Sequence, residues 1–202
     1  MASVTEVALA SGEEQDLARA CAAGDRAAQV RLFRLEVQSV HRLLHRVLGA
    51  SPALEDLIQE SFIRVFRSLA SFRGEAHLST WIARIALRVA YDHLRQARPV
   101  ASHLESVPDL ASDDADAERQ LMAREGLRRL YRILARLEPR QRIAFSLCAI
   151  DGRSQQEVAA LMSASLVATK ARIWRARREV DRLARLDPLL ASLVGDAREA
   201  AR

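Results

Sequence analysis

The sequence has 202 residues, of which half are hydrophobic, and carries 31 basic against 26 acidic side chains for a formal charge of +5. This length and apolar content exclude a wholly disordered chain and suit one domain or two small ones. Aromatic residues make up only 4% and glycines number 7, while Ala, Leu and Arg dominate, so we expect an all-α fold and not a sheet.

The first half of the chain predicts a lobe of four helices. Residues 13 to 49 read as two helices with a break near Gly24 and Asp25. Ser51 and Pro52 then predict a helix N-cap followed by proline at the first helical position. Apolar residues from Leu54 to Leu69 follow the i, i+3, i+4 rule, which leaves a polar face that holds Asp56, Gln59 and Glu60.

A further helix is predicted from about Thr80 to Ala97. It places Ile82, Ile85 and Val89 on one face and Arg84, Arg88 and Arg95 on another. Trp81 stands beside the apolar face, so a role in the core is expected for it.

The segment 99 to 116 contains two prolines and no sustained periodicity. Between Pro99 and Glu118 there are six acidic residues and no Arg or Lys. These features predict a flexible acidic linker between two helical domains.

The second half predicts a helix-turn-helix. A long helix is expected from about Ala117 to Leu137, and Pro139 opens another that Asp151 and Gly152 close. Ser154 and Glu157 have the spacing of a capping box. A short helix to Met162, a turn over residues 163 to 165 and a basic helix after Ser165 complete the arrangement.

The second lobe is basic where it could meet a polyanion. Between Arg140 and Arg178 there are eight basic residues against Asp151 and Glu157. An exposed helix with this charge fits the DNA major groove, where arginines reach phosphates and guanine edges. The alternative is an ordinary solvated helix face in an arginine-rich chain. The basic residues on this helix are Lys170, Arg172, Arg175, Arg177 and Arg178.

Other classes of protein find no support in the sequence. Cys21 and Cys148 belong to no Cys/His cluster, and the i, i+4 pair His41 and His45 lacks an evident third ligand. No phosphate loop or nucleophile with a base is visible, so we expect no enzyme activity and no cofactor. No apolar run approaches a membrane span, and residues 1 to 16 lack the pattern of an export signal, which predicts a cytoplasmic protein without membrane insertion.

Several motifs resemble a known family. Residues 55 to 66, EDLIQESFIRVF, are similar to the second conserved region of sigma factors. Residues 72 to 82 resemble its melting segment, and residues 84 to 95 resemble its minus-ten-reading helix. Residues 137 to 145 and 165 to 178 resemble the fourth region, which in the family grips the minus-thirty-five element. The chain thus resembles an extracytoplasmic-function sigma factor of the sigma-70 family over about residues 15 to 183, in the family's order.

The resemblance implies a promoter-specificity subunit whose partners are core RNA polymerase, promoter DNA and an anti-sigma factor. It implies polymerase binding by Asp56, Gln59 and Glu60. It implies minus-ten recognition and strand capture by the set His77, Ser79, Thr80, Arg84, Arg88 and Arg95. It implies minus-thirty-five recognition by the set Ser165, Lys170, Arg172, Arg175 and Arg177. The domains would be 13–98 and 117–186, joined by the linker 99–116 and followed by an extension, 187–202.

The recognition helix departs from the family's pattern. Val167 and Ala168 stand where relatives usually have glycine and threonine, Thr169 replaces a small aliphatic residue, and Ser163 replaces the usual glycine of the turn. Two other functions therefore stay open. One is a helix-turn-helix DNA-binding regulator with a helical effector domain, and the other is a sigma-fold protein-interaction module without promoter activity.

Overall fold

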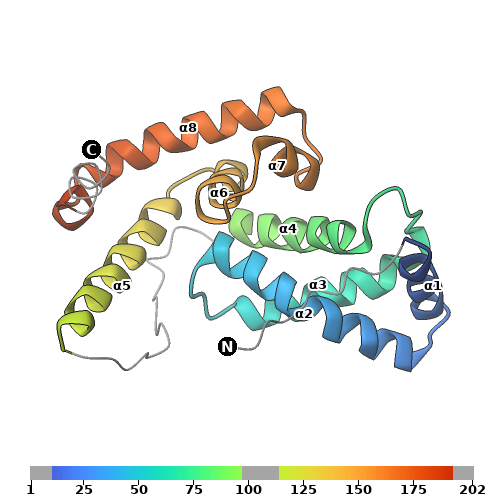
Figure 1. Ribbon diagram of the computed structural model, residues 1–202. Coiled ribbons are helices and arrows are strands. Elements are labelled where there is room, and N and C mark those ends of the chain that lie inside the picture. The colour runs from blue at the N-terminus through green and yellow to red at the C-terminus, as the bar shows by residue number, and fades with distance from the viewer. Residues whose placement is uncertain (1–10, 97–113, 193–202) are drawn as a thin grey trace.

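The computed structural model describes residues 11–96 and 114–192, and every regular element in those ranges is a helix. The expected all-α fold is therefore confirmed. The helices form two lobes that lie against each other, with α4 next to the second lobe and α5 diverging from the rest (Figure 1).

The first lobe is a bundle of four helices: α1 (Ser11–Ala22), α2 (Arg26–Leu48), α3 (Leu54–Ser68) and α4 (Leu78–Gln96). The predicted break near Gly24 is present. There the chain turns through a positive φ of 88°, and the Asp25 carboxylate then caps α2 by accepting hydrogen bonds from the backbone N–H groups of Ala27 and Ala28 at 2.8 and 3.1 Å. The bundle interior is aliphatic, with Leu32, Leu44, Val47, Val65 and Ile82 almost fully buried.

The predicted start of the third helix is wrong by two residues. Pro52 does not occupy the first helical position, because α3 begins at Leu54 with Ala53 as its N-cap residue and no side-chain cap. Ser51 instead closes a turn ahead of the helix. Its hydroxyl accepts from the Ala53 N–H at 3.3 Å and its carbonyl from the Leu54 N–H at 3.0 Å. A single 3-10 turn, η1 (Leu69–Ser71), follows α3.

The second lobe contains α5 (Asp114–Leu134), α6 (Pro139–Phe145), the π-helical turn η2 (Ser146–Ile150), α7 (Gln155–Leu161) and α8 (Leu166–Ala184). Helix α5 both begins and ends about three residues before its predicted bounds. The capping box of Ser154 and Glu157 is confirmed, and the Ser165 side chain caps α8. The predicted helix after Pro139 is present, but its last turn widens into η2.

A small core joins α5, α6 and α8 at the far end of the second lobe. It includes Leu134, Phe145 and Val180, and Leu190 reaches it from beyond α8. Arg129 on α5 pairs with Asp187 at 2.8 Å, and the same carboxylate accepts from the N–H groups of Leu189 and Leu190. The predicted extension after Asp187 is therefore packed up to Leu190, whereas residues 193–202 lie outside the described residues, as does most of the predicted linker.

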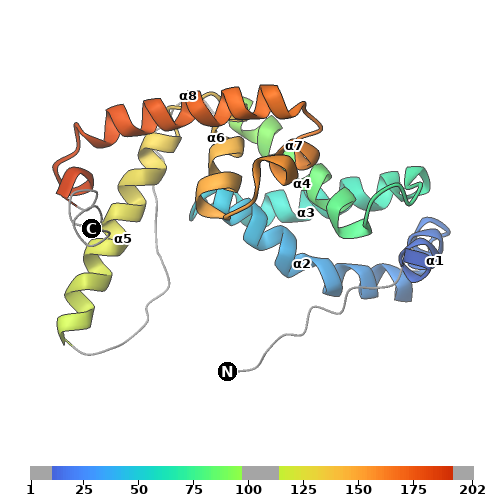
Figure 2. The same cartoon turned by 45° about the horizontal axis from the view of Figure 1, so that its top comes forward.

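The two lobes share one hydrophobic core. Buried residues of α6, η2, α7 and α8 belong to the same cluster as the interior of the first lobe, namely Ile143, Ala144, Leu147, Val158, Leu161 and Ile173. Turning the molecule shows α6 and α7 lying between α4 and α8 (Figure 2). The sequence predicted two lobes but gave no sign of this close packing between them.

Candidate functional site

The predicted polymerase-binding residues lie on the outer side of α3. Asp56 and Gln59 are exposed, whereas Glu60 is half-buried. Glu60 pairs with Arg64 at 2.8 Å, and Arg64 in turn donates to Asp92 of α4 at 2.9 Å. These two carboxylates raise the pKa of the Arg64 guanidinium, with the bond to Asp92 contributing most. Glu60 is thus already engaged in holding α3 against α4, and the more accessible polar groups are Asp56 and Gln59.

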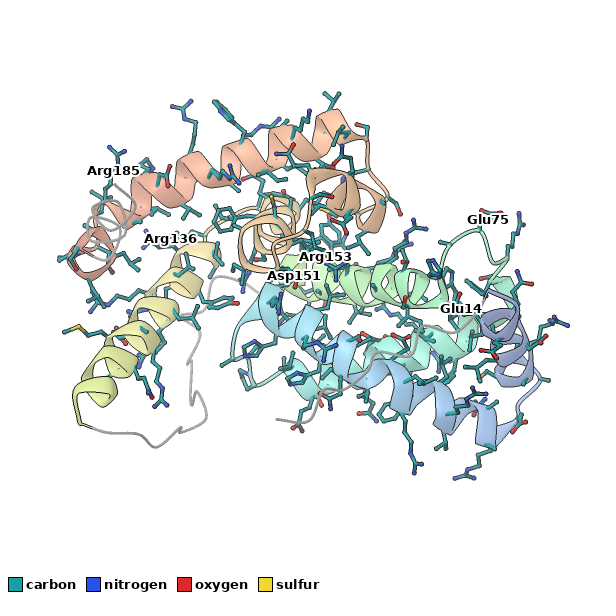
Figure 3. All side chains as sticks on the ribbon, viewed as in Figure 1. Glu14, Glu75, Arg136, Asp151, Arg153 and Arg185 are labelled. Carbon is teal, nitrogen blue, oxygen red and sulfur yellow. The ribbon has the colours of Figure 1, made fainter. Side chains whose placement is uncertain are left out.

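The loop between η1 and α4 is braced by α1. The Glu14 carboxylate accepts from the Leu78 N–H at 3.1 Å and lies 3.4 Å from His77 Nδ1. Figure 3 shows Glu14 on the side of α1 that faces this loop, which carries Glu75. Gly74 turns with a positive φ of 72°, and a Cβ there would lie 2.1 Å from the Gln15 amide nitrogen. The loop is therefore packed and hydrogen-bonded against α1, while His77 and Ser79 stay exposed.

Arginines of both lobes approach the Tyr91 ring of α4. Arg88 and Arg95 are exposed, and the guanidinium of Arg95 lies 5.9 Å from the centre of the Tyr91 ring. Arg140 of α6 lies 5.2 Å from the same ring. Tyr91 was not among the predicted site residues, although its position between Arg88 and Arg95 on one helical face was a usable signal. An aromatic ring among cations is a surface on which an unpaired base can stack.

Two other members of the predicted minus-ten set, Arg84 and Thr80, are half-buried against neighbouring residues. Arg84 is half-buried, and its Nε donates to the carbonyl of Ala160 in α7 at 3.1 Å. Thr80 is also half-buried. Together with Ser79 it lines a cavity of about 330 Å³ between α4, α2 and the second lobe. Trp81 packs on the core and meets Phe72 edge to face, with ring centres 5.6 Å apart, as its apolar neighbours indicated.

The turn of the helix-turn-helix contains a residue in a left-handed conformation. Ser163 has a φ of 48°, a region that disfavours residues with a Cβ and in which glycine is normally used. Ser165, predicted to contact DNA, accepts from the Ala168 N–H at 3.2 Å and so caps α8. Its hydroxyl therefore fixes the start of the recognition helix.

The recognition helix α8 presents cations and two exposed apolar side chains. Lys170, Arg175 and Arg177 are exposed, and Arg172 is half-buried. Val167 is 78% exposed and Trp174 is 58% exposed, with the Arg178 guanidinium 4.8 Å from the Trp174 ring centre. Neither apolar residue was predicted as part of the site, although both fall outside the buried stripe of α8. An exposed apolar side chain on a groove-binding helix can contact a thymine methyl group.

Members of the two predicted DNA-binding sets line one groove between the lobes. The groove has a volume of about 840 Å³, and its walls carry Arg84, Arg88 and Arg95 from α4 and Arg140 and Arg172 from the second lobe. Residues 163 to 165 and Tyr91 also line it. The other cations predicted to contact DNA from α8, Lys170, Arg175 and Arg177, are not among the residues that line this groove. The structure thus joins one end of the recognition helix to the arginine face of α4.

The described residues contain neither a candidate metal-binding cluster nor a helix that could span a membrane. Among residues 11–96 and 114–192, no group of three or more His, Cys, Asp or Glu side chains could hold a metal ion. The rings of His41 and His45 stack with centres 6.0 Å apart. Within the part of the chain that the structure describes, no helix is both long and apolar enough to cross a membrane.

Comparison with known proteins supports both lobes separately. The family "Sigma-70 region 2" matches residues 32–100, and "Sigma-70, region 4" matches residues 127–180. The chain is 32% identical over 167 residues to the ECF RNA polymerase sigma-E factor of Salmonella typhimurium, covering 77% of this chain and 86% of the relative. It is 28% identical over 191 residues to the RNA polymerase sigma-H factor of Pseudomonas aeruginosa, covering 90% and 98%.

Solved structures agree with this relationship. CnrH, determined in complex with the cytosolic domain of CnrY, superposes with a TM-score of 0.57 at 26% identity and covers 86% of this chain and 98% of its own. The sigma factor RpoE of Bartonella quintana, in complex with the anti-sigma factor NepR, has the same fold at 19% identity and a TM-score of 0.52, covering 78% and 96%.

The matches of the two lobes to sigma-70 regions 2 and 4 define a transcription initiation factor that acts with RNA polymerase and is not an enzyme by itself. The chain belongs to the extracytoplasmic-function sigma factors of the sigma-70 family. The predicted family and function are confirmed.

Proposed function

We propose that the work of this sigma factor is divided between its lobes, with the first lobe, residues 13–98, opening the promoter and the second, residues 117–186, docking on duplex DNA. The observation that carries the proposal is the Tyr91 ring of α4, which the Arg95 guanidinium approaches at 5.9 Å and which lines one groove together with Arg88 and Arg95. Unstacking a base costs a few kcal/mol, which stacking and phosphate contacts can return. This surface offers both.

The loop ahead of α4 would hold the captured strand. His77 and Ser79 are exposed at the N-terminal end of α4, and Thr80 lies one residue further on. Arg84, Arg88 and Arg95 continue along the same helix and would follow the phosphates of the opened strand. Tyr91 joins this set as a stacking platform.

Asp56 and Gln59 of α3 would bind core polymerase. Both are exposed on α3, and the acidic strip suits a basic partner surface. Glu60 would contribute mainly by positioning, because its carboxylate is paired with Arg64.

Lys170, Arg172, Arg175 and Arg177 would grip the minus-thirty-five element, with Ser165 fixing the start of the helix that bears them. Phosphate contacts from such side chains set register and affinity, and base contacts set sequence preference. Val167, at the exposed N-terminal end of α8, would add an apolar contact to this readout.

An anti-sigma factor is proposed as a further partner, and the cytoplasm as the compartment. CnrH and the Bartonella RpoE were each solved with a partner protein, described as the cytosolic domain of CnrY and as the anti-sigma factor NepR. The superposition with CnrH covers 86% of the length of this chain.

Run-off transcription with purified core polymerase tests this division. The wild-type chain should direct initiation from its promoter, and Arg88→Ala with Tyr91→Ala should abolish most of it. Arg136→Ala is a matched control, because Arg136 is exposed and lies away from the groove. Duplex binding without polymerase and without initiation would instead favour a simple helix-turn-helix regulator. Neither DNA binding nor initiation would favour a protein-interaction module.

A further inference from the structure

The last turn of α2 obtains its hydrogen-bond donors from the second lobe. The final four carbonyls of a helix have few partners within the helix itself. Here the Gly49 N–H reaches the His45 carbonyl at 2.7 Å. The remaining donors come from residues 85 or more positions away.

Two side chains cover these carbonyls between them. Arg142 on α6 donates from Nε to the Val47 carbonyl at 2.9 Å and from Nη2 to the Leu48 carbonyl at 3.0 Å. The Tyr131 hydroxyl on α5 lies 3.0 Å from the Arg46 carbonyl and 3.3 Å from the His45 carbonyl. We call Tyr131 and Arg142 the latch.

The latch is built for close contact. Arg142 is 8% exposed and Tyr131 is 4% exposed. At Gly49 a Cβ would lie 2.9 Å from two atoms of the Tyr131 ring, so a glycine with positive φ is what lets this ring approach the end of α2. Arg46 also pairs with Asp151, which Figure 3 places where the second lobe meets the first.

The charge in this contact is only partly compensated. Among the described residues no acidic side chain pairs with Arg142, so its positive charge faces the partial negative charge of the helix C-terminus. Burial lowers the pKa of Arg142 to about 10, which leaves it charged at neutral pH. A buried cation held mainly by carbonyl dipoles regains hydration when the contact opens. Such a contact is suited to being broken.

The closed arrangement conflicts with binding to a whole promoter. If α4 reads the minus-ten element and α8 reads the minus-thirty-five element, their sites lie about 25 base pairs apart, or roughly 85 Å of duplex. In the structure Arg84 of α4 bonds to Ala160 of α7, and members of both predicted DNA-binding sets, Arg88 of α4 and Arg172 of α8 among them, line the same groove. One molecule in this state cannot occupy both elements on straight duplex DNA.

We propose that Tyr131 and Arg142 form a conformational latch that caps α2 from the second lobe and holds the sigma factor in a closed state, which must open before the protein can span a promoter. This inference rests on the proposed function for its consequence at the promoter, but not for the latch itself. Polymerase would shift the equilibrium by binding the open state better, and the closed state lowers the apparent affinity by the fraction of molecules that are open.

Small-angle X-ray scattering of the full chain, with circular dichroism, tests the latch. Arg142→Met keeps the length of the side chain but removes its donors, and Tyr131→Phe removes only the hydroxyl. We expect unchanged helical content and a larger radius of gyration, greatest in the double variant. Arg136→Met is the matched control, since it removes an exposed arginine between α5 and α6 and should keep the wild-type radius.

Binding of core polymerase by the same variants tests the role of the latch. Where the closed state dominates, the double variant should bind about tenfold more tightly than the Arg136→Met control, which corresponds to about 1.4 kcal/mol. An unchanged radius would overturn the latch. Loss of helical content in both single variants would also overturn it, because the lobes must stay folded when a latch opens. A larger radius without tighter binding would overturn its gating role, whereas failure of the Arg88 and Tyr91 variants in transcription concerns the proposed function alone.

Discussion

The Glu14 carboxylate of α1 accepts a hydrogen bond from the Leu78 N–H at the start of α4, across 64 positions of sequence. Leu78 is the first residue of α4, so its N–H has no partner within the helix. An acidic group at this place also complements the positive end of the helix dipole. The N-terminal helix therefore takes part in fixing the loop that would capture the opened strand.

Glu14→Ala should lower the free energy of unfolding by about 1 kcal/mol, as for loss of a helix cap. Urea unfolding followed by circular dichroism measures this change. Glu13→Ala is the control, because Glu13 is exposed one position away and should cost much less. Equal effects of the two variants would show that Glu14 does not cap α4.

Thr169→Val should stabilise the second lobe. Among the described residues, the Thr169 and Ser146 hydroxyls are the buried side-chain oxygens without a hydrogen-bond partner. An unsatisfied buried polar group costs about 1–3 kcal/mol, and an apolar group of the same shape removes that cost. We expect a gain of about 1 kcal/mol in urea unfolding and unchanged binding to duplex DNA, since Thr169 is fully buried. Thr169→Ser keeps the hydroxyl and loses the methyl group, so it should destabilise the protein.

Stability should decline as the pH falls below about 6.5. Burial lowers the pKa of His93 and of His45, with further lowering by Arg142 at His93 and by His41 and Arg46 at His45. In the unfolded chain these groups bind protons near pH 6.5. The stabilisation is therefore complete above that pH and is lost as the pH falls through the lower pKa values of the folded protein. Urea unfolding at pH 7.5 and 5.5 should show this, and His93→Gln should flatten the difference. An equal pH difference in His93→Gln would contradict the assignment.

Local signals in the sequence were sufficient for much of the fold. Helical periodicity located the helices, the Ser154 and Glu157 spacing gave the start of α7, and Ser165 gave the start of α8. These features succeed because their interactions join residues three or four apart. The predicted start of α3 was wrong because the Ser51 hydroxyl closes a turn instead of capping the helix.

Non-local relationships could not be predicted in the same way. Arg142 lies 95 positions from Val47, and Tyr131 lies 86 positions from His45, so nothing near either residue indicates that they meet. The candidate site could be predicted less fully than the helices but better than these non-local contacts. Its cations could be predicted from charge and helical face, and Tyr91 shares that face with Arg88 and Arg95, but the contact of Arg140 from the other lobe with the Tyr91 ring could not be predicted.

Charge reversal on α3 should separate polymerase binding from folding. Asp56→Arg should weaken association with core polymerase, by roughly 2 to 5 kcal/mol if Asp56 meets a buried cation there. Glu60→Arg should weaken it as well, but should also destabilise the fold because it breaks the pair with Arg64. Undiminished association of the double variant, measured by gel filtration or fluorescence, would refute the placement.

Substitutions on α8 should weaken docking in a salt-dependent way. Replacing Lys170, Arg172 and Arg175 with alanine removes up to three phosphate or base contacts. The salt dependence of duplex binding should then flatten by about one unit for each lost phosphate contact. Titrations at several salt concentrations measure the slope. Binding that weakens equally at all salt concentrations would point to base contacts instead.

Substitutions on α4 and its loop should act at a different step. Arg84→Ala with Arg88→Ala, or His77→Ala with Ser79→Ala, should spare docking on duplex DNA. They should impair capture of the opened strand, because the free energy returned after unstacking comes from that surface. Arg84 also bonds to Ala160, so its replacement should loosen the closed state as well, and the loop pair isolates capture from that effect.

Transcription from an ordinary duplex promoter, compared with one that carries a pre-melted bubble, locates the defect. If the loop variants are impaired on duplex DNA and restored by the bubble, the lost step is opening. If they are as defective on the bubble as on the duplex, they have lost strand capture or polymerase binding, and direct binding of core polymerase separates those two. Full activity on both templates would show that the surface from Ala76 to Arg88 does not melt DNA. The α8 variants should differ from all of these, because a bubble at the minus-ten element restores no contact to the minus-thirty-five element.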